Sequence, residues 1–218
     1  MKKLLPLLFF VLLHANLFAD DSKDFAIKLL DKAVENLMAD AGVQMEFSYS
    51  VCDGNGDVQF TDEGTFLMDS STDENKLQRY SLKMNEMQVW CDGELQWTYM
   101  TQSNEVYVTK ANSNEMQNLS PLYFMQLYKN GYTCSAEARS GNMEVTLRPQ
   151  QETVDFDEVL IILDMKTLRP KRIYLYTNVS DCAKISINGY KRECKFENSQ
   201  FVCPAELLKS AEVINMYD

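Results

Sequence analysis

Residues 87–99 read MQVWCDGELQWTY, residues 104–108 read NEVYV, and residues 120–125 read SPLYFM. An apolar strand runs into the pair Asp92-Gly93, which favours a tight hairpin turn. The strand after the turn alternates aromatic and polar residues, so its large side chains share one face. This part of the chain therefore predicts an aromatic sheet with a helix that can lie across it. It contains no obvious catalytic group, which points to the binding of apolar ligands.

Two helices and a series of strands are expected around this hairpin. Apolar residues at helical spacing predict a helix over residues 22–39, and Gly42 just past its end suits a helix C-cap. A second helix is expected over residues 121–129, with Ser120 as its N-cap and Gly131 as its C-cap. The expected strands cover residues 45–51, 58–68, 80–84, 87–89, 95–99, 104–108, 143–147, 159–163, 171–177, 183–190 and 192–196.

Short turns between neighbouring strands imply antiparallel pairing. The sequence thus predicts an α+β fold, in which a large curved antiparallel sheet or incomplete β-barrel carries a few helices against one face. We find no Pro-, Gly- or Ser-rich linker, so residues 20–218 are expected to form a single domain.

The first 19 residues have the pattern of a secretory signal peptide. Lys2 and Lys3 precede a short apolar run, and Ala19 offers a small residue before Asp20. No cysteine stands directly after the expected cleavage point, since Cys52 is the first in the chain. We therefore expect an exported, soluble protein of the periplasm without a lipid anchor.

Charge and histidine content exclude several functions. The chain has a net charge of −11, or about −13 without the two N-terminal lysines, and is therefore expected to be repelled by nucleic acid. Its one histidine is His14, inside the expected signal peptide. Histidine-dependent hydrolase mechanisms and zinc sites with histidine ligands are thereby excluded from the mature chain. No enzyme, no cofactor and no metal site is expected.

The six cysteines form no Cys-x-x-Cys pair, so redox motifs and zinc ribbons are not indicated. An even number in an exported chain suggests disulfides, of which 15 complete pairings are possible for six cysteines. A bond between Cys194 and Cys203, which flank an expected turn, is one hypothesis. Buried free thiols are the alternative.

The chain resembles the periplasmic lipoprotein carriers of the LolA-like family. The resemblance rests on the Asp-Gly turn after the first strand, the segment Gly64-Thr65-Phe66-Leu67-Met68, the hairpin DGELQWTY of residues 92–99, the sequence Ser120-Pro121-Leu122 and the strands of residues 160–176. It implies an unclosed β-barrel with a helical lid over an apolar cavity. It also implies a monomeric carrier of acylated lipoproteins or lipids, loaded by an inner-membrane lipoprotein-releasing transporter and unloaded at an outer-membrane acceptor.

The expected cavity lining combines this resemblance with the alternation of the strands. It consists of Phe47, Tyr49, Phe60, Phe66, Met68, Tyr80, Leu82, Leu95, Trp97, Tyr99, Leu122 and Met125. The same residues could fill an ordinary core, in which case the protein would be a non-transporting binding, sensor or scaffold module with the same fold. One departure from the family concerns the lid, because the basic residue that helps to hold it shut is replaced by Asp69-Ser70-Ser71-Thr72.

Overall fold

The computed structural model describes residues 7–53, 55–69, 79–111, 121–151, 156–177 and 182–217, with side chains from residue 22 onward. The helical segments are α1 (Leu7–Met38), α2 (Pro121–Gln126), the 3-10 turns η1 (Leu127–Asn130) and η2 (Asn198–Phe201), and α3 (Ala205–Ser210). The strands are β1 (Gly42–Cys52), β2 (Val58–Asp69), β3 (Arg79–Lys83), β4 (Met87–Cys91), β5 (Leu95–Met100), β6 (Glu105–Lys110), β7 (Tyr132–Arg139), β8 (Asn142–Pro149), β9 (Glu158–Asp164), β10 (Pro170–Tyr176), β11 (Cys182–Lys191) and β12 (Glu212–Asn215).

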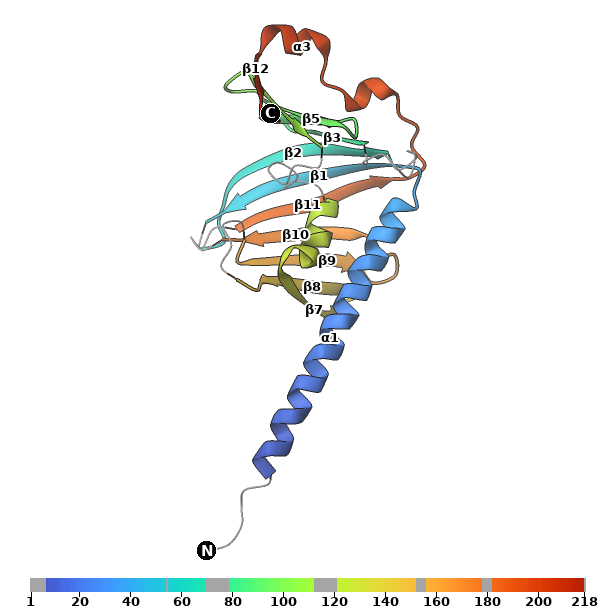
Figure 1. Cartoon of the computed structure of the whole chain (residues 1–218), viewed down its shortest axis with the longest axis vertical. Helices are drawn as coiled ribbons and strands as arrows, with labels where there is room; N and C mark the ends of the chain where they lie inside the picture. Colours follow the sequence, from blue (N-terminus) through green and yellow to red (C-terminus); the bar gives the residue numbers. More distant parts are fainter. Residues whose placement is uncertain are drawn as a thin grey trace, which may run out of the picture.

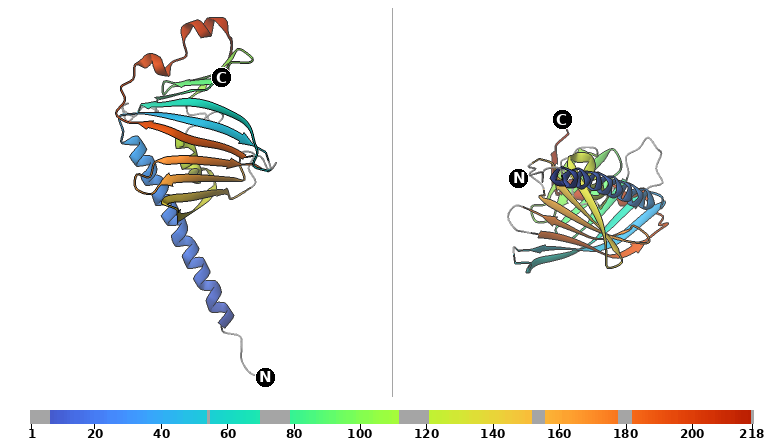
Figure 2. Two further views of the ribbon diagram at one scale, coloured as in Figure 1. Left: turned by 180° about the vertical axis from the view of Figure 1, so that it is seen from behind. Right: turned by 90° about the horizontal axis from the view of Figure 1, so that it is seen from below.

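In the described residues, 12 strands form one sheet in the order β12-β6-β5-β4-β3-β2-β1-β11-β10-β9-β8-β7. Neighbours pair antiparallel, except that β12 lies parallel to β6. β12 and β7 are the two edges, so the sheet is not closed. It curls around its concave side, across which α1 runs (Figure 2). The predicted α+β fold with an incomplete barrel and helices on one face is confirmed.

The sheet consists of two runs of consecutive strands, β1–β6 and β7–β11, which are joined only where β1 pairs with β11. We call this junction the seam. It is the pairing with the longest separation along the chain in the sheet's antiparallel part, from Gln44 opposite Lys191 to Cys52 opposite Cys182. α1 and α2 lie on one face of the sheet, which we call the inner face, whereas α3 lies near the edge of the sheet that β12 forms beside β6 (Figure 1).

Several local predictions are confirmed. Asp92 turns the chain as expected, because its carboxylate accepts hydrogen bonds from the amides of Glu94 and Leu95 and Gly93 has a φ of 94°. Gly131 ends the second helical segment with a φ of 84°. That segment is α-helical only to Gln126 and then tightens to a 3-10 turn. Its expected cap Ser120 lies outside the described residues.

Other predictions are wrong. The expected strand at residues 192–196 is an extended segment without sheet pairing, which the amide of Cys194 joins to the carbonyl oxygen of Gly42. The strands β7 and β12 and the helix α3 were not expected. α1 begins at Leu7 rather than near residue 22 and projects past the sheet (Figure 1).

No helix of the described residues has both the length and the apolarity needed to span a membrane.

Candidate functional site

The inner face forms the main apolar core between the sheet and the two helices. α1 contributes side chains at helical spacing, and α2 contributes four of its six residues. These helical residues are Ala26, Leu30, Ala33, Leu37, Pro121, Leu122, Phe124 and Met125. Helices rather than a second sheet cover this face, so the strand pairing of the sheet does not depend on them.

A small apolar cavity of about 10 Å³ lies between the start of α2 and the seam. It is lined by Met45, Phe47, Phe66, Pro121, Ile185 and Ile187. A volume of this size corresponds to about one water molecule. An acyl chain can therefore enter at this point only if α2 moves away from the sheet.

Eight of the twelve expected lining residues gather on the inner face. Six are buried in its core, namely Phe47, Phe66, Met68, Leu82, Leu122 and Met125. Tyr49 and Tyr80 are partly buried against them. Phe60 has the same parity along β2 as Phe66, but it lies near the far end of the strand and is 39% exposed. The seven of these nine residues that lie on β1, β2 and β3 follow the alternation predicted for those strands, and Leu122 and Met125 lie on α2.

Leu95, Trp97 and Tyr99 are an exception, because they lie on the opposite face. The register of β4 and β5 places Thr98 opposite Val89, a residue of the inner core, and Trp97 opposite Trp90. The three residues belong to a second cluster, formed with Trp90, Val106, Val108, Cys203, Leu207, Leu208, Ala211 and Tyr217. The expectation that they line the inner cavity is corrected by this register. Both faces of β5 are buried, so hydrophobicity alone does not distinguish the inner one.

The inner face of β3–β6 instead carries a polar row that sequence reasoning missed. Tyr80, Cys91, Gln96 and Thr109 lie opposite one another on successive strands. The Tyr80 hydroxyl donates to Oε1 of Gln96. Thr109 is 2% exposed, and its hydroxyl has no hydrogen-bond partner among the described residues. The apolar inner face thus ends in hydroxyl and amide groups that can bind an ester or a peptide group.

Burial raises the pKa of the Cys91 thiol in this row to about 11, from the ordinary value of 9.0. The neutral thiol stabilises the fold below pH 9, and this contribution is lost as the pH rises through 11. We expect wild-type protein to lose about 2 kcal/mol more unfolding free energy between pH 9 and pH 11 than Cys91→Ala. Urea denaturation at a series of pH values measures this difference. Parallel curves for the two proteins would contradict it.

Polar contacts hold the helices in place, among them a 3.4 Å hydrogen bond from Nδ2 of Asn36 on α1 to the carbonyl oxygen of Thr167. The Tyr128 hydroxyl of η1 donates to Oδ1 of Asp31 on α1, which connects the two covering segments. Just beyond α1, the 1% exposed Asp40 accepts hydrogen bonds from Nε of Arg192 at 2.6 Å and from the Tyr190 hydroxyl at 3.3 Å. The contact of Tyr128 lies between the two covering elements, whereas that of Asp40 joins the end of α1 to β11.

Near residue 69, where the resemblance implied a basic residue that holds the lid, the structure has an ion pair between the ends of two strands. Asp69, the last residue of β2, pairs with Arg79, the first residue of β3. Arg79 also donates to Oδ1 of Asn198 at 2.6 Å and lies 5.0 Å from the ring centre of Phe201. This arginine therefore holds the C-terminal segment rather than the helices of the inner face. Residues 70–72 lie outside the described residues.

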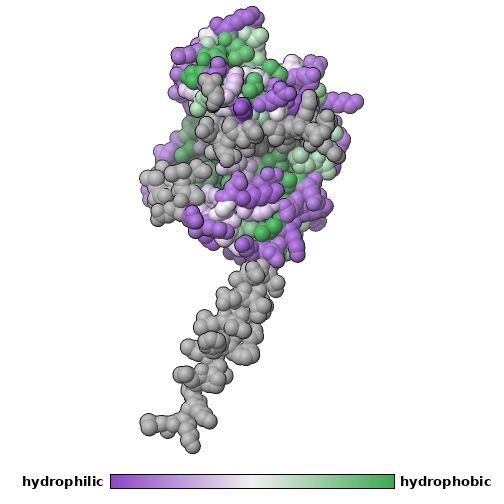
Figure 3. All heavy atoms as spheres, viewed as in Figure 1, coloured by the Kyte–Doolittle hydropathy of each residue, from purple (hydrophilic) through white to green (hydrophobic). Residues whose placement is uncertain are grey.

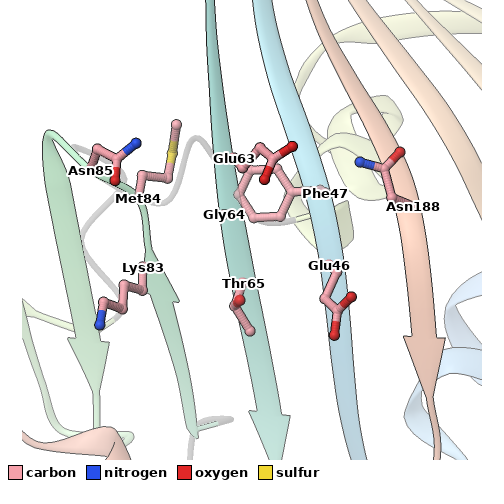
Figure 4. Close-up of a pocket in the computed structure, with 9 residues that line it drawn as sticks. All are labelled: Glu46, Phe47, Glu63, Gly64, Thr65, Lys83, Met84, Asn85 and Asn188. Carbon is pink, nitrogen blue, oxygen red and sulfur yellow. The ribbon is translucent and has the colours of Figure 1, made fainter.

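A groove of about 550 Å³ lies beside the β3–β4 turn (Figure 4). It is lined by Glu46, Phe47, Glu63, Gly64, Thr65, Lys83, Met84, Asn85 and Asn188. The ring of Phe47 lies over Gly64, and a Cβ atom at Gly64 would overlap it. This explains the glycine that interrupts β2. The mixed charges of the lining suit a polar ligand better than an acyl chain.

All six cysteines are free thiols in the structure, including Cys194 and Cys203. Cys203 is buried in the second cluster, whereas Cys194 lies beside the start of β1. The expected bond between these two is therefore absent. Among the described residues, no group of three or more His, Cys, Asp or Glu residues is placed to hold a metal ion.

Comparisons with solved structures show what the fold resembles. An uncharacterized conserved protein from Thermus thermophilus has a TM-score of 0.55 and 13% identity, covering 87% of this chain and 98% of that one. A DUF1329 family protein from Desulfovibrio piger has a TM-score of 0.50 and 12% identity, covering 83% and 97%. A putative outer membrane lipoprotein-sorting protein domain from Vibrio parahaemolyticus gives 0.46 and 10%, covering 81% and 97%. At these identities the likeness concerns the fold alone.

The sequence itself provides the assignment. No curated protein matches it. Residues 17–178, however, match the family described as outer membrane lipoprotein carrier protein LolA. That range contains α2, the seam-forming strand β1 and both sides of the predicted Asp-Gly hairpin. Since the match extends over well more than half of the chain, this protein belongs to the outer membrane lipoprotein carrier protein LolA family.

Proposed function

We propose that this protein is a periplasmic carrier that binds acyl chains of lipoproteins or related lipids on its inner face and moves them from the inner to the outer membrane. The observation that carries the proposal is the apolar inner face, which is covered by α1 and α2 and bordered by the polar row. Acyl chains would replace the helical side chains on the sheet. The row of Tyr80, Gln96 and Thr109 would bind the polar groups at the acyl ester.

The energetics of an acyl chain explain why such a carrier would need a cover. About 15 methylenes cost roughly 12 kcal/mol to expose to water, at ~0.8 kcal/mol each. An inner face that was permanently uncovered would leave its own apolar surface in water. Helices that pack on the empty inner face avoid this exposure, and the energy of their packing opposes ligand binding enough to permit release.

The partners follow from the same proposal. An inner-membrane lipoprotein-releasing transporter would load the carrier, and an outer-membrane acceptor would unload it. The net charge of −11 would favour basic docking surfaces on both. Neither step requires a cofactor or a reaction at a covalent bond.

Direct binding tests this function. The protein beginning at residue 20 is purified and titrated with a fluorescent palmitoylated peptide, and lipids that copurify with it are identified by mass spectrometry. We expect saturable binding of the acylated peptide and none of the same peptide without its acyl chain. Protein that copurifies with no lipid and has equal affinity for both peptides would refute the carrier.

The tie between Tyr128 and Asp31 gives a more specific prediction. Tyr128→Phe removes the hydroxyl that connects η1 to α1 but leaves the ring in place. A hydrogen bond to a carboxylate contributes about 1.5 kcal/mol. If α2 and η1 must move for a ligand to enter, we expect about tenfold tighter binding of the palmitoylated peptide. Fluorescence titration measures the change.

Tyr99→Phe is the matched control for this variant. It also removes a hydroxyl bonded to a side chain, here Oδ1 of Asn104, but on the opposite face of the sheet. Its affinity should equal that of the wild type. Weaker or unchanged binding by Tyr128→Phe would show that the cover does not limit ligand entry.

A second candidate function is a non-transporting binding module, in which the inner face is a permanent core. The cavity of about 10 Å³ beside α2 favours this alternative. The same titrations distinguish the two, because a permanent core would bind no acylated peptide and Tyr128→Phe would lower stability without affecting binding.

A further inference from the structure

Two cysteines face each other across the seam. Cys52 is the last residue of β1, Cys182 is the first residue of β11, and the two are direct partners in the antiparallel register. Partners in antiparallel strands have Cα atoms about 4.5 Å or about 5.5 Å apart, and disulfides join Cα atoms about 4.4–6.8 Å apart. Side chains of direct partners also project from the same face. The backbone therefore already has the spacing that a bond requires.

The two side chains project from the same face of the seam, because the residues are direct partners in this register. Cys52 is 8% exposed, whereas Cys182 is only partly buried. Burial and the neighbouring Cys52 both raise the pKa of the Cys182 thiol. Because Cys182 is the more exposed of the two, it is the sulfur that an external reagent can reach, and Cys52 is its direct partner across the seam.

The other four cysteines have different neighbours. Cys91 lies opposite Tyr80 and Gln96, and Cys134 lies opposite Leu147. Cys203 packs in the second cluster, and Cys194 lies beside Gly42. All six cysteines are among the described residues, so Cys52 and Cys182 form the one cysteine pair that the sheet register creates.

We propose that Cys52 and Cys182 form a disulfide that fastens the seam between the two halves of the sheet. The oxidant is an external disulfide, either of a small molecule or of a thiol oxidoreductase. The Cys182 thiolate attacks it, which forms a mixed disulfide and releases one thiol. The Cys52 thiolate then attacks the Cys182 sulfur and releases the second thiol. Two protein thiols are oxidised, one external disulfide is reduced to two thiols, and the protons remain balanced.

The position of this bond gives it a structural effect. It would close the chain between residues 52 and 182, which is a long loop, and long loops gain most from cross-linking in the chain-entropy description. It would also join β1 to β11 at the end of the seam opposite the contact between Gly42 and Cys194. Opening of the two sheet halves at that end would then depend on the redox state.

Peptide mapping of the full chain tests the proposal. The protein is incubated with oxidised glutathione, alkylated, digested with trypsin without reduction, and analysed by mass spectrometry. Trypsin gives residues 33–76 and residues 173–184, each with a single cysteine. We expect these two peptides as one cross-linked species that separates after reduction. Free alkylated Cys52 and Cys182, or a pairing of either one with another cysteine, would overturn the proposal.

Stability provides a second measurement on the same samples. Oxidised wild-type protein should unfold at a urea concentration about 1 M higher than reduced protein. Cys182→Ala should show no such difference, whereas Cys194→Ala should retain it in full. An equal shift in Cys182→Ala would assign the effect to a different pair. The mapping on the wild type requires no variant, so a variant that fails to fold does not affect the test.

Discussion

We expect Ile187→Trp to weaken binding of the palmitoylated peptide by about 100-fold. Ile187 lies on β11 and lines the small cavity beneath Pro121, where α2 meets the seam. The larger indole would occupy the space that an acyl chain takes when α2 moves away. Losing room for three to four methylenes, at ~0.8 kcal/mol each, costs about 3 kcal/mol of binding free energy. Fluorescence titration against the wild type measures the loss.

Two features make this variant informative. Ile187 is only partly buried, so the added volume should strain the fold less than it would at Ile185, which is 4% exposed. Leu208→Trp is the control, since it adds similar bulk to the second cluster on the opposite face. Unchanged affinity in Ile187→Trp, with loss in Leu208→Trp, would place the ligand beneath α3 and contradict the proposed site.

The features that sequence could predict are those that neighbouring residues determine. The hairpin at Asp92-Gly93 forms because the Asp92 carboxylate accepts hydrogen bonds from the amides of Glu94 and Leu95 and Gly93 adopts a positive φ. Alternation placed Phe47, Phe66 and Leu82 on one face correctly, because the other face of those strands is more polar. Such signals depend only on residues a few positions apart, and they also identified the open sheet covered by helices.

The features that sequence could not predict depend on distant partners. Alternation along residues 95–99 assigns Trp97 to the inner face. Nothing in the neighbouring sequence indicates that the C-terminal segment returns to cover the outer face of β5. The same limit applies to the cysteines, since 15 pairings satisfy the composition and only the β1–β11 register selects Cys52 with Cys182. A polar row such as that of Gln96 and Thr109 is also indistinguishable from solvent-facing positions until the sheet is assembled.

If a ligand enters when α1 and α2 move, the sheet beneath them must remain intact. Space-filling atoms show apolar groups on the face that carries α1 and α2, between polar side chains (Figure 3). The stability of the seam is therefore the condition on which the proposed carrier function depends.

We expect Gly42→Ala to weaken this seam severely. The sequence suggested that Gly42 ends the first helix, but α1 already ends at Met38 and Gly42 is the first residue of β1. The glycine is needed for a close approach instead, because a Cβ atom there would overlap the carbonyl oxygen of Cys194. The hydrogen bond from the Cys194 amide to the Gly42 carbonyl oxygen, 3.0 Å long, would be strained at the same time.

Overpacking against backbone together with loss of this bond should lower the free energy of unfolding by about 3 kcal/mol. Urea denaturation measures the change. Gly189→Ala is the matched control on the partner strand, because its added Cβ would meet only side-chain atoms of Glu46, at 3.1 Å or more, and no backbone atom. It should cost less than about 1 kcal/mol. Equal losses in the two variants would mean that the glycine at position 42 is not needed to avoid a clash with the backbone. The strand pairing alone would then hold the seam.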